Sequence, residues 1–77
     1  MNKERRGRLI KAQEMLEEAM SIIDEVKDDE SEAFDNMPEG LQMSERGEKM
    51  EENVSSLEDL SYAISDLVDS ITEIVEG

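Results

Sequence analysis

Carboxylates are the most abundant chemically capable side chains in this sequence. The run DDESE, residues 28–32, has the spacing of the first, third and fifth ligands of a calcium-binding loop, and Glu39 fits the twelfth position. The sixth position of such a loop requires glycine for its sharp turn, but Ala33 stands there. Because the run also falls within a helical pattern, we interpret it as the solvated acidic end of a helix.

Other reactive groups are few. The chain contains no cysteine and no histidine, which excludes disulfides, thiolate zinc sites and imidazole ligands. Its serines, lysines and single tyrosine form no nucleophile motif, and no glycine-rich phosphate loop is present. We therefore expect a protein that is not an enzyme and has no cofactor and no metal.

Charge is segregated along the chain. There are 22 acidic and 8 basic residues, a net charge of −14; residues 1–11 carry a local +4, which leaves −18 for residues 12–77. Binding to nucleic acids and anionic membranes depends on basic residues, so we expect neither and favour a protein partner with a basic or apolar surface. A weaker alternative is nucleic-acid binding through the basic residues Lys3, Arg5, Arg6, Arg8 and Lys11.

The elements that must position these groups are two helices. In the first half of the chain, apolar residues recur at alternating intervals of three and four, broken only at Glu30, which is the heptad pattern of a helix packed along one seam. No proline interrupts it, so the pattern predicts a helix from about residue 3 to 35. The seam residues are Leu9, Ala12, Leu16, Ala19, Ile23, Val26, Ala33 and Met37, flanked by Met15, Met20 and Ile22.

The second half repeats this design from about residue 45 to 76. Ser44 is the predicted N-cap, although Gly47 stands where a capping box has Glu or Gln. The seam consists of Met50, Val54, Leu57, Ser61, Ile64, Val68, Ile71 and Val75, and a second row, seven residues apart, of Leu60, Leu67 and Ile74.

Residues 36–44 are predicted to form the turn between these helices. Pro38 cannot continue a helix, Gly40 permits a left-handed backbone, and Asn36 suits a cap. Two helices of about 48 Å with a short connection predict an all-α, single-domain, antiparallel hairpin. We expect the apolar turn residues to close the end of its core, with a recognition loop as the alternative; they are Met37, Leu41 and Met43.

The basic N-terminus and the acidic C-terminus are each unfavourably placed on their own helix dipole. In an antiparallel hairpin they lie side by side, so we expect them to offset one another; a free basic arm is the alternative. The acidic cluster consists of Asp66, Asp69, Glu73 and Glu76.

A lone hairpin leaves part of this apolar surface uncovered, and 77 residues make only a marginal core. We therefore predict a homodimer that forms a four-helix bundle, with a third helix from another protein as the alternative. The predicted dimer or partner interface consists of Leu16, Ile23, Leu57, Leu60, Ile64, Leu67, Ile71 and Ile74.

No segment is predicted to cross a membrane or to direct export. The longest uncharged run near the C-terminus, LSYAIS at residues 60–65, falls far short of the roughly 20 apolar residues that span a bilayer. Lys11 and Glu14 interrupt any apolar signal region near the N-terminus. The expected location is the cytoplasm.

Three stretches, KERRGRLIKAQEMLEEA, DDESEAFDNMPEGLQMSERGEKMEENV and SSLEDLSYAISDLVDSI, together resemble small acidic, mostly uncharacterised proteins of bacteriophages and integrated mobile elements. The pieces DNMPEGLQ and SERGE are the most specific part. This resemblance implies expression in a bacterial host and a counter-defence or regulatory role, and it transfers no site residue.

Two functions follow as hypotheses. The first is a non-enzymatic helical protein that acts by binding a protein partner. The second is an inhibitor that imitates nucleic acid, because duplex DNA carries about 28 phosphate charges over 48 Å and the chain has 22 acidic residues. The acidic surface of this mimic would include Glu17, Glu18, Asp24, Asp28, Glu51, Glu52, Glu58 and Asp59.

Overall fold

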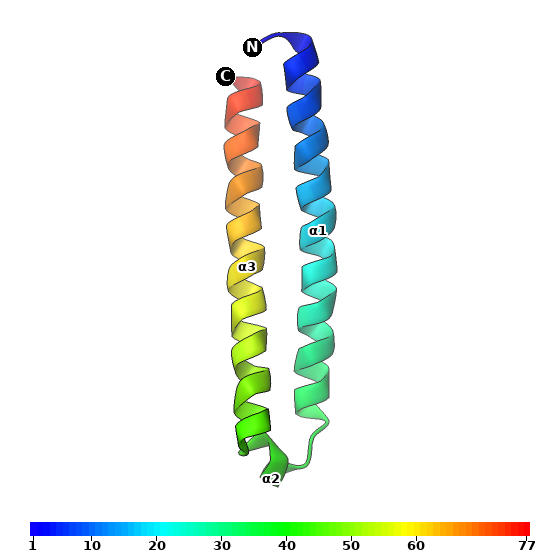
Figure 1. The fold of residues 1–77 in the computed structure, drawn as a ribbon, viewed down its shortest axis with the longest axis vertical. Helices are drawn as coiled ribbons and strands as arrows, with labels where there is room; N and C mark the ends of the chain where they lie inside the picture. The colour runs from blue at the N-terminus through cyan, green and yellow to red at the C-terminus, as the bar shows by residue number, and fades with distance from the viewer.

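The computed structural model describes residues 1–77 and contains only helices (Figure 1). Helix α1 spans Lys3–Asp35, the short helix α2 spans Glu39–Gln42, and α3 spans Glu45–Glu76. The prediction of an all-helical protein is confirmed. One feature was not predicted: residues 36–44, expected to be a plain turn, contain the single helical turn of α2.

Both long helices begin at a capping side chain. The side chain of Asn2 accepts a hydrogen bond from the backbone N of Arg5 at 2.8 Å, and Ser44 Oγ accepts one from the backbone N of Gly47 at 3.4 Å. A Cβ atom at Gly47 would lie 2.1 Å from the carbonyl oxygen of Gln42. Glycine therefore replaces the Glu or Gln of a capping box because the backbone before α3 leaves no room for a side chain.

The chain reverses direction without any left-handed residue. Pro38, with φ −56° and ψ 145°, precedes α2, and no residue has a positive φ. The left-handed backbone expected at Gly40 is therefore wrong, because Gly40 lies within α2. The side chain of Gln42 instead secures the reversal: its Nε2 donates to the carbonyl oxygens of Phe34 at 2.9 Å and Asp35 at 3.4 Å.

The expected apolar closure of the turn is only partly present. Met37 is half-buried, but the side chains of Leu41 and Met43 are 49% and 78% exposed. The prediction is wrong for Leu41 and Met43, since the turn of α2 directs them away from the contact between the long helices.

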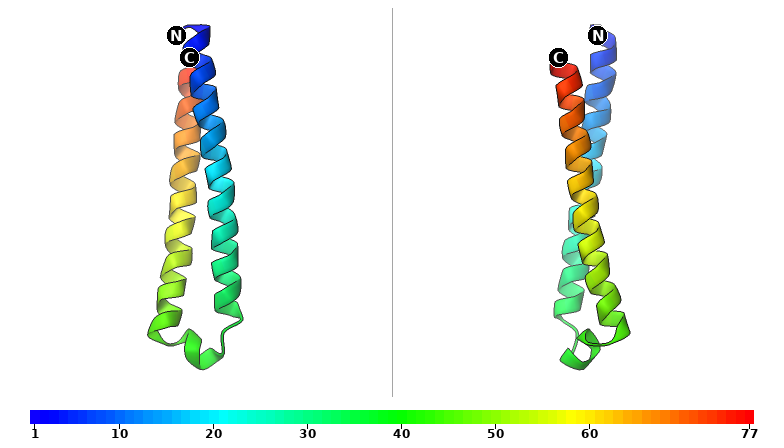
Figure 2. Two further views of the ribbon diagram at one scale, coloured as in Figure 1. Left: turned by 45° about the vertical axis from the view of Figure 1, so that its right-hand side comes forward. Right: turned by 90° about the vertical axis from the view of Figure 1, so that its left-hand side faces the viewer.

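Helices α1 and α3 lie side by side and run in opposite directions, so both termini lie at the same end of the molecule (Figure 1). They cross at a shallow angle (Figure 2), and the whole molecule measures 58 × 14 × 13 Å. Three hydrogen bonds between side chains fix their register. Gln13 Nε2 donates to Thr72 Oγ1 at 2.5 Å, Ser61 Oγ to Asp24 Oδ1 at 2.8 Å, and Asn53 Nδ2 to Glu30 Oε2 at 2.9 Å.

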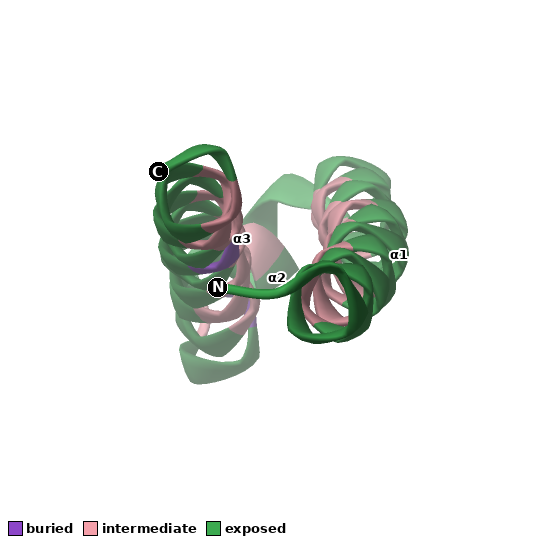
Figure 3. Ribbon diagram, turned by 90° about the horizontal axis from the view of Figure 1, so that it is seen from above, coloured by how far each residue is buried: buried purple, intermediate pink, exposed green.

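The seam predicted for α3 faces α1. Half-buried residues line the sides of the two helices that face each other (Figure 3). All eight predicted seam residues of α3 are half-buried, except Ile64, which is buried with 8% exposure.

The seam of α1 differs from the predicted one. Val26 and Ala33 are exposed, and Lys27, Glu30 and Phe34 are half-buried in the contact. Phe34 fills more of the seam than alanine can, and the aliphatic stem of Lys27 can lie along it while the ammonium group reaches water. The half-buried seam therefore consists of Leu9, Gln13, Leu16, Met20, Ile23, Lys27, Glu30, Phe34 and Met37, and the predicted seam residues Ala12 and Ala19 are half-buried at its edge.

The core of this helix pair is thin. Ile64 and Gly47 are its only buried residues. A single layer of contact between two helices cannot remove the remaining apolar side chains from water.

Candidate functional site

The contact between α1 and α3 leaves two long faces of the helix pair open to solvent. On one face, Val26 and Leu60 line a shallow groove together with Asn53 and the carboxylates Asp29 and Glu30. On the other, a groove is lined by Ser31 and Glu58, among others. Val26 and Ser31 are five residues apart, hence about 140° apart around α1, so the two grooves flank the seam on opposite sides.

The face that contains Val26 and Leu60 is almost free of charge. Residues seven apart, and residues three or four apart, lie on the same side of a helix in such a pair. We define the apolar face by the residues of 12–33 and 53–74 that share this side with Val26 and Leu60, among which Asp29 is the only charged one; the same rows continue into the basic residues Arg8 and Lys49 nearer the helix ends. They are Ala12, Met15, Ala19, Ile22, Val26, Asp29 and Ala33 of α1, and Asn53, Ser56, Leu60, Ala63, Leu67, Ser70 and Ile74 of α3.

Large apolar side chains on this face are well exposed. Met15 is 62% exposed and Ile22 55% on α1, and Leu67 is 53% and Ile74 51% on α3. Scattered exposed apolar residues are ordinary, but a continuous stripe of them along two adjacent helices marks an interaction surface.

The opposite side of the pair is polar. We define the polar face by the rows Glu17, Asp24 and Ser31 of α1, and Glu51, Glu58, Ser65 and Thr72 of α3. Tyr62 lies beside it, and its hydroxyl donates to Glu58 Oε1 at 3.2 Å. Carboxylates and hydroxyls here can be hydrated or paired, so this face needs no cover.

The predicted interface residues fall into two groups. Leu16, Ile23, Leu57 and Ile71 are half-buried and Ile64 is buried, all in the seam between α1 and α3. Leu60, Leu67 and Ile74 are exposed on the apolar face. The prediction combined two surfaces that the structure separates, because the apolar stripe of α3 is wider than the seam and only part of it faces α1.

The predicted acidic surface is not confined to one face. Asp24 is half-buried beside Ser61, and the other seven residues are exposed. Glu17, Glu51 and Glu58 belong to the polar face. The outward sides of the helices carry Glu18, Asp28, Glu52 and Asp59.

Two amides that contribute to the pairing of the helices were missed from the sequence. Gln13 donates to the carbonyl oxygen of Val68 at 3.1 Å as well as to Thr72, and Asn53 donates to Glu30. The position of Gln13 could have been predicted from its spacing. It lies four residues after Leu9 and three before Leu16, so it completes an alternative seam. The amides hold the register of α1 against α3, so they determine which rows share a face.

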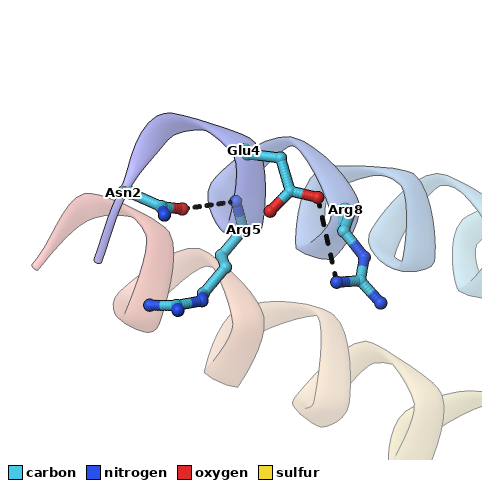
Figure 4. Close-up of polar contacts among 4 residues, drawn as sticks. All are labelled: Asn2, Glu4, Arg5 and Arg8. Carbon is cyan, nitrogen blue, oxygen red and sulfur yellow. Dashed lines mark hydrogen bonds and ion pairs between the residues drawn. The ribbon is translucent and has the colours of Figure 1, made fainter.

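The N-terminal basic cluster makes no ion pair with α3. The one ion pair of the molecule joins Arg8 to Glu4 within α1, with 3.9 Å between Nη1 and Oε1 (Figure 4). The basic N-terminus and the acidic C-terminus were expected to offset one another, but no ion pair joins them. The side chains of Lys3, Arg5, Arg6 and Lys11 form no ion pair within the molecule and are available to other groups.

No group of three acidic side chains is arranged to hold a metal ion. Neither long helix is apolar enough over its length to span a bilayer. No protein-family model, characterised protein or solved structure matches this chain.

Proposed function

We propose that this protein is a non-enzymatic helical interaction module that binds a protein partner through its apolar face. The observation that carries this proposal is the stripe of exposed apolar side chains along both helices, interrupted by one carboxylate, Asp29, in a chain whose net charge is −14. Most acidic residues occupy the other sides of both helices, so their scarcity on this side favours contact with an apolar surface.

Burial of the stripe supplies a driving force of useful size. Full burial of a large aliphatic side chain contributes about 1.5–3 kcal/mol, so the burial of one that is half exposed contributes about 1 kcal/mol more. Six such side chains lie on the face: Met15, Ile22, Val26, Leu60, Leu67 and Ile74. A helix pair docked on them would complete the layer that α1 and α3 lack and form a four-helix bundle.

The experiment compares two aspartate substitutions on α3, each at an exposed side chain. Leu67→Asp places a charge on the apolar face, and Tyr62→Asp places one beside the polar face, where 63% of Tyr62 is exposed. Far-UV circular dichroism checks that both variants keep the helicity of the wild type, as expected for residues outside the seam.

Binding is then measured by light scattering for self-association, and by quantitative mass spectrometry of proteins retained from a bacterial lysate by each immobilised variant. We expect Leu67→Asp to reduce the bound species about tenfold or more, since a charge is costly in an apolar contact, and Tyr62→Asp to leave it unchanged. Equal retention by Leu67→Asp and the wild type would disprove this function.

A second candidate is a nucleic-acid mimic that acts through the carboxylates outside the apolar face. It is favoured by their number and by the open rows on the polar face, of which Glu17, Glu51 and Glu58 are exposed. Such a mimic would occupy the basic groove of a nucleic-acid-binding protein.

The mimic has its own signature in solution. Substitution of Glu51 and Glu58 with Gln would slow association with a basic partner and reduce its dependence on salt, because exposed charges act mainly on the association rate. Duplex DNA would compete for the same partner. A partner whose binding ignores both DNA and this double substitution excludes the mimic and leaves the apolar face as the binding surface.

A further inference from the structure

We propose that the occupant of the apolar face is a second copy of this chain, packed face to face with its ends reversed. The inference rests on the proposed function, because it names the partner of the same face. A twofold axis then runs perpendicular to the long axis of the molecule, so that the turn of each copy lies beside the termini of the other.

The apolar face is suited to a copy of itself. A twofold interface brings the same patch of both chains together, so the patch must tolerate its own charges. Between residues 12–33 and 53–74 this face has only Asp29, its rows end in the basic residues Arg8 and Lys49, and the other acidic residues of both copies would remain in solvent. Two molecules of net charge −14 can thus meet without carboxylate rows against each other.

The two ends of the helix pair differ in charge, and this difference selects the orientation. The end with the termini, residues 1–11 and 73–77, has five basic side chains against Glu4, Glu73 and Glu76, a side-chain charge of +2. The end with the turn, residues 28–52, has ten acidic side chains against Arg46 and Lys49, a charge of −8.

Packed helices lie about 8–10 Å apart, within the Debye length of about 10 Å at 0.1 M salt. Copies aligned in the same direction would place the two −8 ends together. Reversed copies place each −8 end against a +2 end and separate the like ends by nearly the 58 Å length of the molecule.

The rows on the face also fit this arrangement. We place the twofold axis at the height of Ala63 along the length of the molecule. Leu60 of each copy then lies at the same height as Leu67 of the other copy, and Ala19 of each copy at the same height as Ile22 of the other. The small Ala19 then opposes the large Ile22, and the leucines of the two copies meet near the axis, so apolar side chains face apolar ones. Asp29 lies one turn of helix from the level of the other copy's Arg8, whose present partner is Glu4 at 3.9 Å.

Spin labels at single cysteines test the proposal, since the chain has no cysteine of its own. Met43→Cys carries a label at the turn end, where Met43 is 78% exposed and makes no helix contact that the label could disturb. Tyr62→Cys is the matched control near the level of the proposed axis, because Tyr62 is 63% exposed and lies outside the apolar face. Both labelled chains are compared by pulsed electron paramagnetic resonance at concentrations up to the millimolar range.

For reversed copies we expect a distance of about 60 Å between the two labels at residue 43, because each lies about 20 residues of helix from the axis. We expect a distance below about 40 Å between those at residue 62, because only two layers of helices, each about 10–12 Å in diameter, separate them. Distances below about 40 Å at both positions mean copies aligned in the same direction; they overturn the inference and leave the proposed function intact. No measurable distance at residue 62 means no second copy, and it overturns the inference as well. The proposed function itself fails only by the separate comparison of Leu67→Asp with Tyr62→Asp.

Discussion

The two faces of the helix pair use the same helices and the same heptad spacing but leave opposite surfaces. On the apolar face, Val26 and Leu60 line a groove in which neither is covered. On the polar face, the corresponding rows contain Asp24 and Glu58, which accept hydrogen bonds from Ser61 and Tyr62. The polar groups of the polar face can form local hydrogen bonds or be hydrated, whereas the large apolar side chains of the apolar face are about half exposed to solvent.

This difference supports the proposal that the chain alone is an incomplete layer. A helix that serves only a pair needs one narrow apolar seam, and a wider stripe indicates a larger bundle. In α3 the seam around Ile64 and the row of Leu60, Leu67 and Ile74 together make such a wide stripe. Association should therefore depend on the outer row, while folding of the pair depends on the seam.

Ile64→Asp should have the largest effect, because it disrupts the seam between α1 and α3, and both faces exist only while these helices are paired. Ile64 is the only buried apolar residue, and a carboxylate there would have no partner. We expect a loss of about 3 kcal/mol or more in the free energy of unfolding, a large part of the total for a small domain. Far-UV circular dichroism should show loss of helicity. A folded monomer that only fails to associate would instead place Ile64 at an interface between molecules.

Gly47→Ala should have a smaller effect, on the start of α3 and thus on the register that places the rows. A Cβ at Gly47 would meet the carbonyl oxygen of Gln42 at 2.1 Å, whereas one at Gly7 has nothing within 4 Å. We expect Gly47→Ala to destabilise the protein by about 1–3 kcal/mol and Gly7→Ala to stabilise it by about 0.5–1 kcal/mol. Thermal unfolding measures both, and a rise in the midpoint for Gly47→Ala would contradict the close approach.

Pro38→Ala should have the smallest effect, because the turn lies outside both faces. The φ of −56° at Pro38 is accessible to alanine, so only a small change in unfolding free energy is expected, through the greater freedom of the unfolded chain. Helicity and molecular mass should match the wild type. Loss of partner binding in this variant, with helicity unchanged, would move the recognition site from the apolar face to the turn.

The sequence was sufficient to predict the helices because both are long, strongly periodic and free of internal proline. It was also sufficient for the seam of α3. In α1 two seams share Leu9, Leu16 and Ile23, one completed by Ala12, Ala19, Val26 and Ala33, and the other by Gln13, Met20, Lys27 and Phe34. Hydropathy favoured the first. The structure has all four residues of the second half-buried, but of the first only Ala12 and Ala19, because side-chain size and the register of α3 decide between the two sets.

The division of the apolar residues into seam and outer face could not be predicted from one helix at a time. Leu57 and Leu60 have the same hydropathy and lie three residues apart. Their roles differ only because Asn53 and Gln13 fix the rotation of α3 against α1. The close approach at Gly47 was likewise invisible, since it depends on where α2 ends.

The polar seam residues near the turn have a consequence for motion. Lys27 and Glu30 are successive polar positions in the seam between Ile23 and Phe34, whereas Leu16, Met20 and Ile23 are successive apolar ones on the side of the termini. Local opening is easiest where few apolar contacts must be broken. Amide hydrogens of residues 27–31 and 53–58 should therefore exchange with solvent faster than those of residues 13–23 and 61–71. The pair would loosen first at this polar stretch, while Phe34 and Met37 keep the helices in contact beside the turn.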